Sequence, residues 1–129
     1  MTDLKKINTN VVVTAKPKHE HLHEVEGANL VFSYLIRIEN QSNDTIKLLR
    51  RHWFICDGNY DEREVEGQGV VGEQPILEPG DTFEYQSWCP IISEFGYMGG
   101  YYTFNSVEKH ENFIVEIPTF LLLPNYVLN

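Results

Sequence analysis

A two-residue hydrophobic period recurs along most of this chain. Between residues 31 and 39, for example, Phe32, Tyr34, Ile36 and Ile38 occupy every second position. Because successive side chains of a β-strand point to opposite faces, this spacing predicts a strand with one buried face. No segment of the sequence has the spacing of a long amphipathic helix. The pattern therefore predicts an all-β fold.

Turn-forming residues separate the alternating segments at roughly regular intervals. Polar, glycine or proline-glycine turns occur at residues 40–44, 57–59 and 79–81. We predict strands at residues 11–15, 31–39, 46–56, 62–65, 83–88, 96–107 and 112–117. About seven or eight short strands predict an antiparallel two-sheet sandwich of the immunoglobulin or fibronectin type III kind, with a closed barrel as the alternative. We expect one domain over residues 1–129.

The core is predicted from the apolar residues that share one face of each segment. They are Phe32, Tyr34, Ile36, Ile38, Trp53, Phe83, Tyr85, Phe104, Phe113, Val115 and Ile117. The pair Gly99-Gly100 lies inside a predicted strand and indicates a bulge. Pro17 follows the first predicted strand, as expected at the edge of a sheet, because proline has no N–H to donate.

The charge balance narrows the range of partners. The formal net charge is −9 and the pI is near 4.9. Nucleic acids and anionic membranes attract a surplus of Lys and Arg, so neither is expected as a partner. Cations or basic protein surfaces suit this chain better. No apolar run follows the first residues, which predicts neither a signal peptide nor a membrane anchor, and hence a cytoplasmic protein without membrane insertion.

The two cysteines, Cys56 and Cys89, are too few for a disulfide framework and lack the CxxC spacing of a structural zinc site. We expect both thiols to be reduced. A thiol nucleophile with His52 or His110 as its base is the catalytic alternative, but both cysteines lie in apolar alternating runs, where buried inert thiols are common. No motif pairs two carboxylates for acid–base catalysis. The sequence therefore predicts a protein that is not an enzyme and needs no cofactor.

Residues 67–72 match the G-x-G-x-x-G pattern of dinucleotide-binding loops. That motif requires a helix directly after the last glycine, and Pro75 and the Pro79-Gly80 pair prevent one. We therefore favour a structural loop between strands. The alternative is a phosphate or diphosphate site, in which glycine amides form a nest and arginines supply positive charge. Its candidate residues are Gly67, Gly69, Gly72 and Arg63, with Arg51 as a second counter-charge and with neighbouring glutamates opposing it.

Four motifs occur in a distinctive order along the chain. They are Phe32-x-Tyr34-x-Ile36-x-Ile38-x-Asn40, then Leu49-x-Arg51-x-Trp53-x-Ile55, then the stretch from Gly67 to Pro75 followed by Pro79-Gly80, and last Gly96-x-Met98-x-Gly100-x-Tyr102. This ordered set resembles the bacterial ApaG family over nearly the whole chain. The resemblance implies a fibronectin type III-like sandwich, no settled activity, and a family label that links these proteins to cobalt resistance and magnesium efflux. Related domains in eukaryotes occur beside F-box modules and in a polymerase-interacting protein, which implies a protein-binding role.

Two features depart from the pattern of that family. Trp88-Cys89 stands where small residues are usual, and the histidine-rich segment at residues 19–24 is not a family feature. If this segment is extended, His19, His21 and His23 lie on one side, where their nitrogens could bind zinc, cobalt or nickel. We favour the alternative of a solvated connection between the first two strands, because no group that would orient the imidazoles is evident.

Three functions of different classes follow from these patterns. We favour a non-enzymatic module that uses strand edges and loops to bind another protein, or a second copy of this chain. The second is an anion-binding protein that uses the glycine segment. The third is a divalent-cation binding protein that uses the acidic surface and the histidines.

Overall fold

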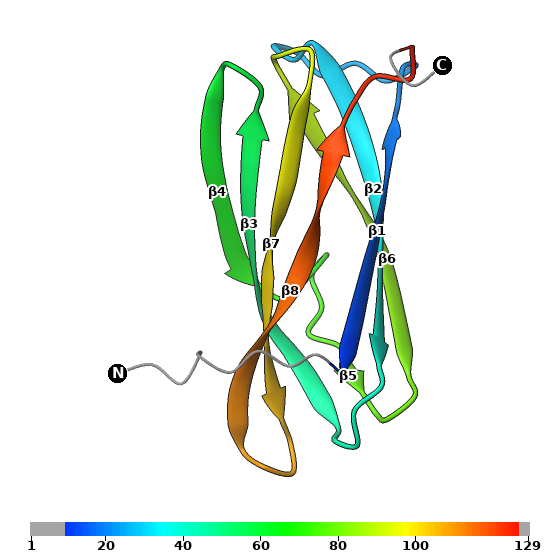
Figure 1. Ribbon diagram of the computed structural model, residues 1–129, viewed down its shortest axis with the longest axis vertical. Coiled ribbons are helices and arrows are strands. Elements are labelled where there is room, and N and C mark those ends of the chain that lie inside the picture. The colour runs from blue at the N-terminus through cyan, green and yellow to red at the C-terminus, as the bar shows by residue number, and fades with distance from the viewer. Residues whose placement is uncertain (1–9, 127–129) are drawn as a thin grey trace.

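The computed structural model describes residues 10–126 of the chain. Within those residues it contains eight β-strands and no helix that could cross a membrane (Figure 1). The strands are β1 (Val11–His19), β2 (Leu30–Asn40), β3 (Ile46–Asp57), β4 (Asp61–Gln68), β5 (Ile76–Leu77), β6 (Thr82–Ile91), β7 (Gly96–Ser106) and β8 (Glu111–Leu122). They form two antiparallel sheets that pack face to face, which confirms the predicted all-β sandwich.

The two sheets differ in size and meet closely at one side. The smaller sheet has the strand order β1-β2-β6, and the larger has the order β4-β3-β7-β8 with β5 paired to β3. β1 packs beside β8 and closes one side of the sandwich, as Figure 1 shows. β4 and β6 are the remaining edge strands, and they border the opposite side.

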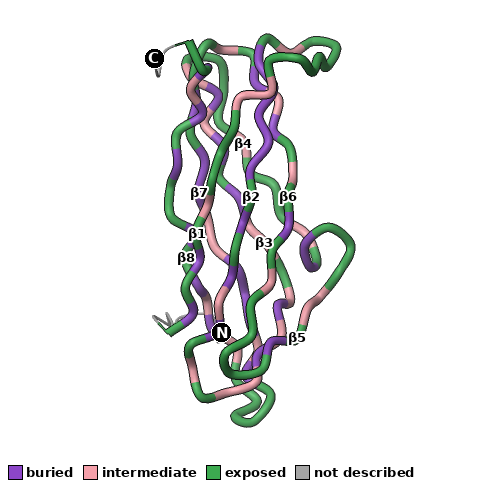
Figure 2. Tube along the Cα trace, turned by 90° about the vertical axis from the view of Figure 1, so that its right-hand side faces the viewer, coloured by how far each residue is buried: buried purple, intermediate pink, exposed green. Residues whose placement is uncertain are grey.

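The alternation of the sequence produces the core between the sheets. In β2, Phe32, Tyr34, Ile36 and Ile38 are all buried, and the positions after Tyr34 alternate between exposed and buried. Figure 2 shows buried and exposed residues interspersed along most of the strands, although β4 has no buried residue. Every residue predicted for the core is buried except Phe83, which is half-buried and packs against the core.

Several strands extend beyond their predicted ends, among them β6, which runs to Ile91, and β8, which runs to Leu122. β1 continues through Pro17 to His19, which an edge strand tolerates because the missing N–H faces away from its neighbour. β4 continues to Gln68 and so includes Gly67, which the sequence had suggested as part of a loop. The two-residue strand β5 was not predicted, because its pairing with β3 leaves no periodic signal.

Two register shifts bend the five-stranded sheet. One lies at Gly99, between β7 and β8, and confirms the bulge expected from the glycine pair. The other lies at Leu49, between β3 and β7, and was not predicted. Before this bulge, even-numbered residues such as Leu48 point into the core, whereas after it the odd-numbered residues such as Trp53 do. The bulge therefore turns Arg51 toward the space between the sheets.

Candidate functional site

The outer face of the five-stranded sheet carries a group of exposed aromatic and acidic side chains. Beyond the bulge at Leu49, the even-numbered residues of β3 point to this face, and strand pairing puts glutamates of β4 beside them. We call this surface the acidic aromatic face. It comprises His52, Phe54, Tyr97, Tyr101 and Leu121 together with Glu62, Glu64, Glu66 and Glu116.

Apolar exposure is high at the centre of the acidic aromatic face. Phe54 is 46% exposed, Tyr97 44% and Leu121 58%, although the strands that carry Phe54 and Tyr97 are inner strands of the sheet. Hollows of about 350 Å³ and 580 Å³ share the Phe54 side chain as a wall. The first also touches Glu62, and the second touches Glu116. Large exposed apolar groups with a polar rim are typical of protein interaction surfaces.

His52 holds the acidic rim in place. Its Nε2 lies 2.8 Å from Glu64 Oε1, and its Nδ1 lies 3.1 Å from Glu66 Oε2. The imidazole stacks on Tyr101, with ring centroids 5.0 Å apart and an interplanar angle of 14°. The side chains of Glu64 and Glu66 nevertheless remain 63% and 59% exposed. Their carboxylates are therefore oriented but still accessible to a cationic partner.

The glycine segment forms a tight hairpin that projects from the end of β4. The backbones of Val70 and Glu73 exchange two hydrogen bonds of 2.8 Å each. Between them, Val71 and Gly72 have φ angles of 42° and 81°. Positive φ at both central residues is the pattern of a type I′ hairpin turn. The structural loop between strands that we favoured from the sequence thus takes the form of a hairpin turn.

The polar groups of this hairpin bind β3. The Gly69 amide donates to the Leu49 carbonyl at 2.8 Å, and the hairpin bonds occupy two further amides. Arg51 Nη1 donates to the carbonyls of Gln68 and Gly69 at 3.1 Å and 2.9 Å. Arg51 therefore contacts carbonyl oxygens of the hairpin, and the amides of Gly69, Val70 and Glu73 are already hydrogen-bonded within the protein. Anion binding by Gly67, Gly69 and Gly72 stays a prediction.

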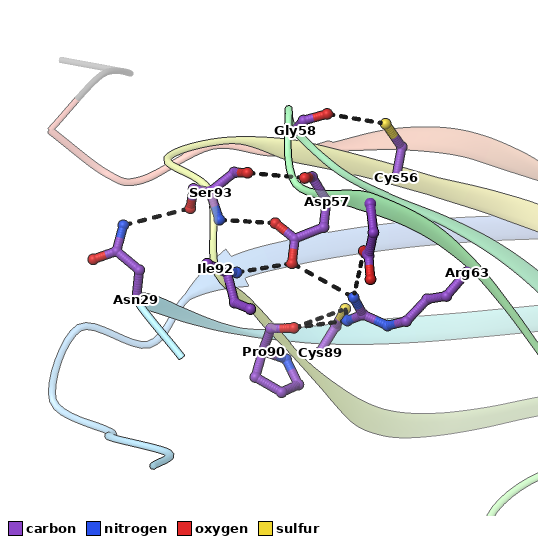
Figure 3. A network of polar contacts seen from close by, with 10 residues as sticks. Asn29, Cys56, Asp57, Gly58, Arg63, Cys89, Pro90, Ile92 and Ser93 are labelled. Carbon is purple, nitrogen blue, oxygen red and sulfur yellow. Dashed lines mark hydrogen bonds and ion pairs between the residues drawn. The ribbon is translucent and has the colours of Figure 1, made fainter. Parts of the chain in front are cut away.

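Arg63 lies away from the glycines with which the sequence had grouped it. It is four residues before Gly67 on β4, a separation of about 13 Å along an extended strand. Its Nη1 lies 3.5 Å from Asp57 Oδ2, and its Nη2 donates to the Pro90 carbonyl at 2.9 Å. Figure 3 shows the guanidinium turned into this network of polar contacts. The structure therefore does not bring Arg63 to the loop as a counter-charge.

Asp57 is the centre of that network. Its carboxylate is fully buried and accepts the amides of Ile92 and Ser93 at 2.8 Å each (Figure 3). Burial works to raise the pKa of Asp57, but the hydrogen bonds from Ser93 and Ile92 and the charge of Arg63 outweigh it and hold the pKa below its usual value. The network ties the β3–β4 turn to the β6–β7 loop.

Of the three histidines of the predicted metal site, His19 and His21 stay neighbours, with ring centroids 6.1 Å apart, whereas His23 lies elsewhere. β1 ends at His19, so the extended alternation that would align the three side chains stops there. His19 accepts the Asn125 amide at 3.0 Å and lies 5.4 Å from the Phe32 ring, whereas His23 lies 5.0 Å from the Trp88 ring. In residues 10–126, no group of three or more His, Cys, Asp or Glu side chains is placed to hold a metal ion.

Both cysteines are free thiols. Cys89 is buried, and burial raises the pKa of its thiol. Cys56 is half-buried, and its sulfur lies 3.7 Å from the Gly58 carbonyl oxygen. These surroundings favour the protonated, weakly nucleophilic form of Cys89.

Sequence reasoning missed the acidic aromatic face. Glu62, Glu64 and Glu66 occupy every second position of one segment, which is a sequence signal for a row of carboxylates on one face of a strand. The position of Phe54 and His52 beside that row depends on the bulge at Leu49 and on the pairing of β3 with β4. Neither of these can be read from the alternation alone.

Comparisons with known proteins agree with the fold. A family model described as the ApaG domain matches residues 20–106. Protein ApaG of Sinorhizobium fredii is 40% identical over 117 residues, which cover 90% of this chain and 89% of that protein. Protein ApaG of Methylorubrum populi is 41% identical over 113 residues, with 87% and 86% covered.

Two solved structures closely resemble the structure of this chain. An X-ray structure from the Northeast Structural Genomics Consortium aligns with a TM-score of 0.86 at 34% identity, covering 95% of this chain and 92% of that one. The crystal structure of the putative ApaA protein from Bordetella pertussis aligns with a TM-score of 0.78 at 38% identity, covering 88% and 93%.

Proposed function

This chain belongs to the ApaG family, and we propose that it is a non-enzymatic module that binds a basic segment of another protein through the acidic aromatic face. The observation that carries the proposal is the exposure of Phe54 and Tyr97 on inner strands, beside the row of glutamates on β4. A Lys or Arg side chain can pair with these carboxylates and lie against the aromatic rings.

Edge protection alone does not account for this surface. Charged side chains on an edge strand such as β4 do discourage unwanted strand pairing. That explanation covers the glutamates but not the exposed Phe54, because β3 is paired on both sides. The two hollows beside Phe54 offer room for side chains of an incoming segment.

The proposal has consequences for the cellular role. The protein would act in the cytoplasm, without a cofactor of its own. It would influence cobalt and magnesium homeostasis, with which the family resemblance associates these proteins, through the protein to which it binds. The net charge of −9 would accelerate association with a basic partner.

Photo-crosslinking tests the proposal. A benzophenone amino acid is introduced in place of Phe54, and in a second protein in place of Leu35, which is 38% exposed on the outer face of the smaller sheet. After irradiation in an extract of the source cells, we expect a discrete adduct from position 54 only. Mass spectrometry of the adduct should find the crosslink within a segment rich in Lys and Arg.

A pair of charge variants supplies the matched control. Glu64→Gln removes a carboxylate of the acidic aromatic face, and Glu84→Gln removes one that pairs with Arg37 at 3.2 Å on the other sheet. Loss of the adduct in Glu64→Gln and its retention in Glu84→Gln are expected. An adduct that forms equally from both positions, or that lies in an acidic or neutral segment, would refute the proposal.

A further inference from the structure

A cavity opens between the two sheets on the side bordered by β4 and β6. Its volume is about 310 Å³, close to the lower end of the range for small-molecule sites. Tyr34, Trp53 and Met98 in its wall are almost fully buried, whereas Val71 and Trp88 are about half exposed. The cavity therefore has a buried interior and a mouth at the surface.

Arg51 supplies the only arginine charge in the wall of this cavity. The bulge at Leu49 turns the side chain inward, and Gly67 leaves space for it, because a Cβ at Gly67 would lie 2.9 Å from Arg51 Nη2. Nη1 is held by two backbone carbonyls of the glycine hairpin. The hairpin thus fixes the guanidinium at the cavity.

The charge of Arg51 has no carboxylate counterpart in the part of the chain that the structure describes. The other three arginines there each contact a carboxylate: Arg37 with Glu84, Arg50 with Glu66, and Arg63 with Asp57 and Asp61. The contacts of Arg51 are neutral carbonyl oxygens. A partly buried cation with neutral partners favours an anion as a ligand.

Tyrosine hydroxyl groups add hydrogen-bond donors next to Arg51. Tyr34 and Tyr85 line the cavity, and the Tyr85 hydroxyl lies 2.5 Å from that of Tyr102. Burial raises the pKa of all three phenols, so they keep their protons at neutral pH. The Tyr85–Tyr102 pair uses one of its two protons internally, and when Tyr102 is the donor, the Tyr85 proton is left for a ligand in the cavity.

The remaining wall is mostly apolar. It includes Trp53, Val65, Val70, Val71, Trp88 and Met98. One fixed cation, hydroxyl donors and apolar walls match a monoanion with a hydrophobic body. A polyphosphate would need more positive charge than one arginine supplies in a protein with a net charge of −9.

We propose that this cavity binds a small carboxylate with an aromatic or aliphatic body. Its carboxylate pairs with Arg51 and the tyrosine hydroxyls, and its body packs against Trp53, Val65 and Met98. This site is separate from the acidic aromatic face, because it lies between the sheets and the face lies on the outside. A failure to find carboxylate binding in the cavity would therefore not count against the proposal that the acidic aromatic face binds a protein.

Tryptophan fluorescence is a direct readout, because both tryptophans of the chain line the cavity. The full chain is titrated with benzoate and hexanoate, with benzamide as the neutral counterpart of benzoate and with inorganic phosphate as a second anion. Calorimetry confirms each isotherm. We expect saturable binding of benzoate or hexanoate, and affinity for benzamide at least about tenfold lower, since a charge-assisted pair is lost. Phosphate should not saturate the site.

Neighbouring arginines give a matched pair of variants. Arg51→Gln removes the cavity charge and should weaken carboxylate binding by about tenfold or more, whereas Arg50→Gln removes an identical charge from the outer face and should leave it within about twofold. If Arg51→Gln does not fold, Ser87→Leu decides the question, because Ser87 lines the cavity and a larger side chain would fill it. Loss of binding in Ser87→Leu supports the proposal.

Four results would overturn it. They are the absence of saturable carboxylate binding to the wild type, equal affinity for benzamide and benzoate, equal losses in the two arginine variants, and unchanged binding in Ser87→Leu.

Discussion

The hydroxyl groups of Tyr85 and Tyr102 lie 2.5 Å apart, although the two residues belong to different sheets. Tyr85 is on β6 of the smaller sheet, and Tyr102 is on β7 of the larger one. Both side chains are buried, so this hydrogen bond connects the sheets inside the core. It lies on the side where β4 and β6 leave the sandwich open, opposite the contact between β1 and β8.

Replacing Tyr85 by Phe removes this connection between the sheets. We expect the free energy of unfolding to fall by about 0.5–1.5 kcal/mol, the usual net contribution of a buried hydrogen bond. Urea denaturation followed by tryptophan fluorescence measures it. Tyr60→Phe is the control, because Tyr60 is 61% exposed. In a double-mutant cycle, adding Tyr102→Phe to Tyr85→Phe should lower the free energy of unfolding only slightly further, because the hydrogen bond is already lost. Strictly additive losses of unfolding free energy would contradict a hydrogen bond between the two hydroxyl groups.

Asp57 should be a major determinant of stability. Asp57→Asn keeps the size of the side chain but removes the charge that faces two backbone amides and Arg63. We expect a loss of about 2–4 kcal/mol, because the buried donors lose a charged acceptor. Chemical denaturation at neutral pH measures the loss. Asp61→Asn, whose side chain is 43% exposed, should change stability by less than about 0.5 kcal/mol. Similar losses in both variants would count against a central role for Asp57.

The same carboxylate should make stability depend on pH. Because the pKa of Asp57 is lower in the folded than in the unfolded protein, its contribution is complete above the ordinary aspartate range, near about pH 4. The contribution falls as the pH drops below that range toward the folded pKa. The difference in unfolding free energy between wild type and Asp57→Asn should therefore shrink on acidification. A difference that is constant or grows toward low pH would be inconsistent with a lowered pKa.

The sequence predicts the sheets better than the sites because strand alternation is a local signal. The burial of Tyr34 and Trp53 follows from the two-residue period, and the Gly99 bulge follows from paired glycines. No residue pattern in the sequence indicates the bulge at Leu49. This bulge nevertheless determines that Arg51 faces the cavity and that Phe54 faces the solvent. Site composition depends on pairing between distant strands, which one sequence does not reveal.

The candidate residues named from the sequence illustrate the same limit. Arg63 and the glycines are close in sequence, but the extension of β4 to Gln68 carries them apart along the strand. His19 and His23 are equally close, but the end of β1 separates their side chains. Proximity in sequence predicts proximity in space only when the local backbone conformation is known.

Gly69 should tolerate no side chain. Its φ is 67°, and an added Cβ would overlap the carbonyl oxygen of Glu73 in the facing arm of the hairpin. Gly69→Val should therefore lower the unfolding free energy by about 3 kcal/mol, through backbone strain and displacement of the hairpin. Thermal denaturation provides the measurement. Gly72→Ala is the control for strain alone, because a Cβ there meets nothing within 4 Å, and its loss should be about 1 kcal/mol. Equal losses would show that contact with Glu73 is unimportant.

Val71 should be one position where a single substitution increases stability. A β-branched residue at φ 42° is strained, and the first central position of a type I′ turn favours Asn. Val71 is 53% exposed, so replacing it sacrifices little burial. We expect Val71→Asn, which creates an Asn-Gly turn, to raise the unfolding free energy by about 1 kcal/mol and to increase the melting temperature by a few degrees. The control is Val65→Asn, at a strand position of 39% exposure, which should destabilise because asparagine is unfavourable in strands. A loss of stability in Val71→Asn would mean that contacts of the valine with the cavity mouth outweigh the strain of its backbone.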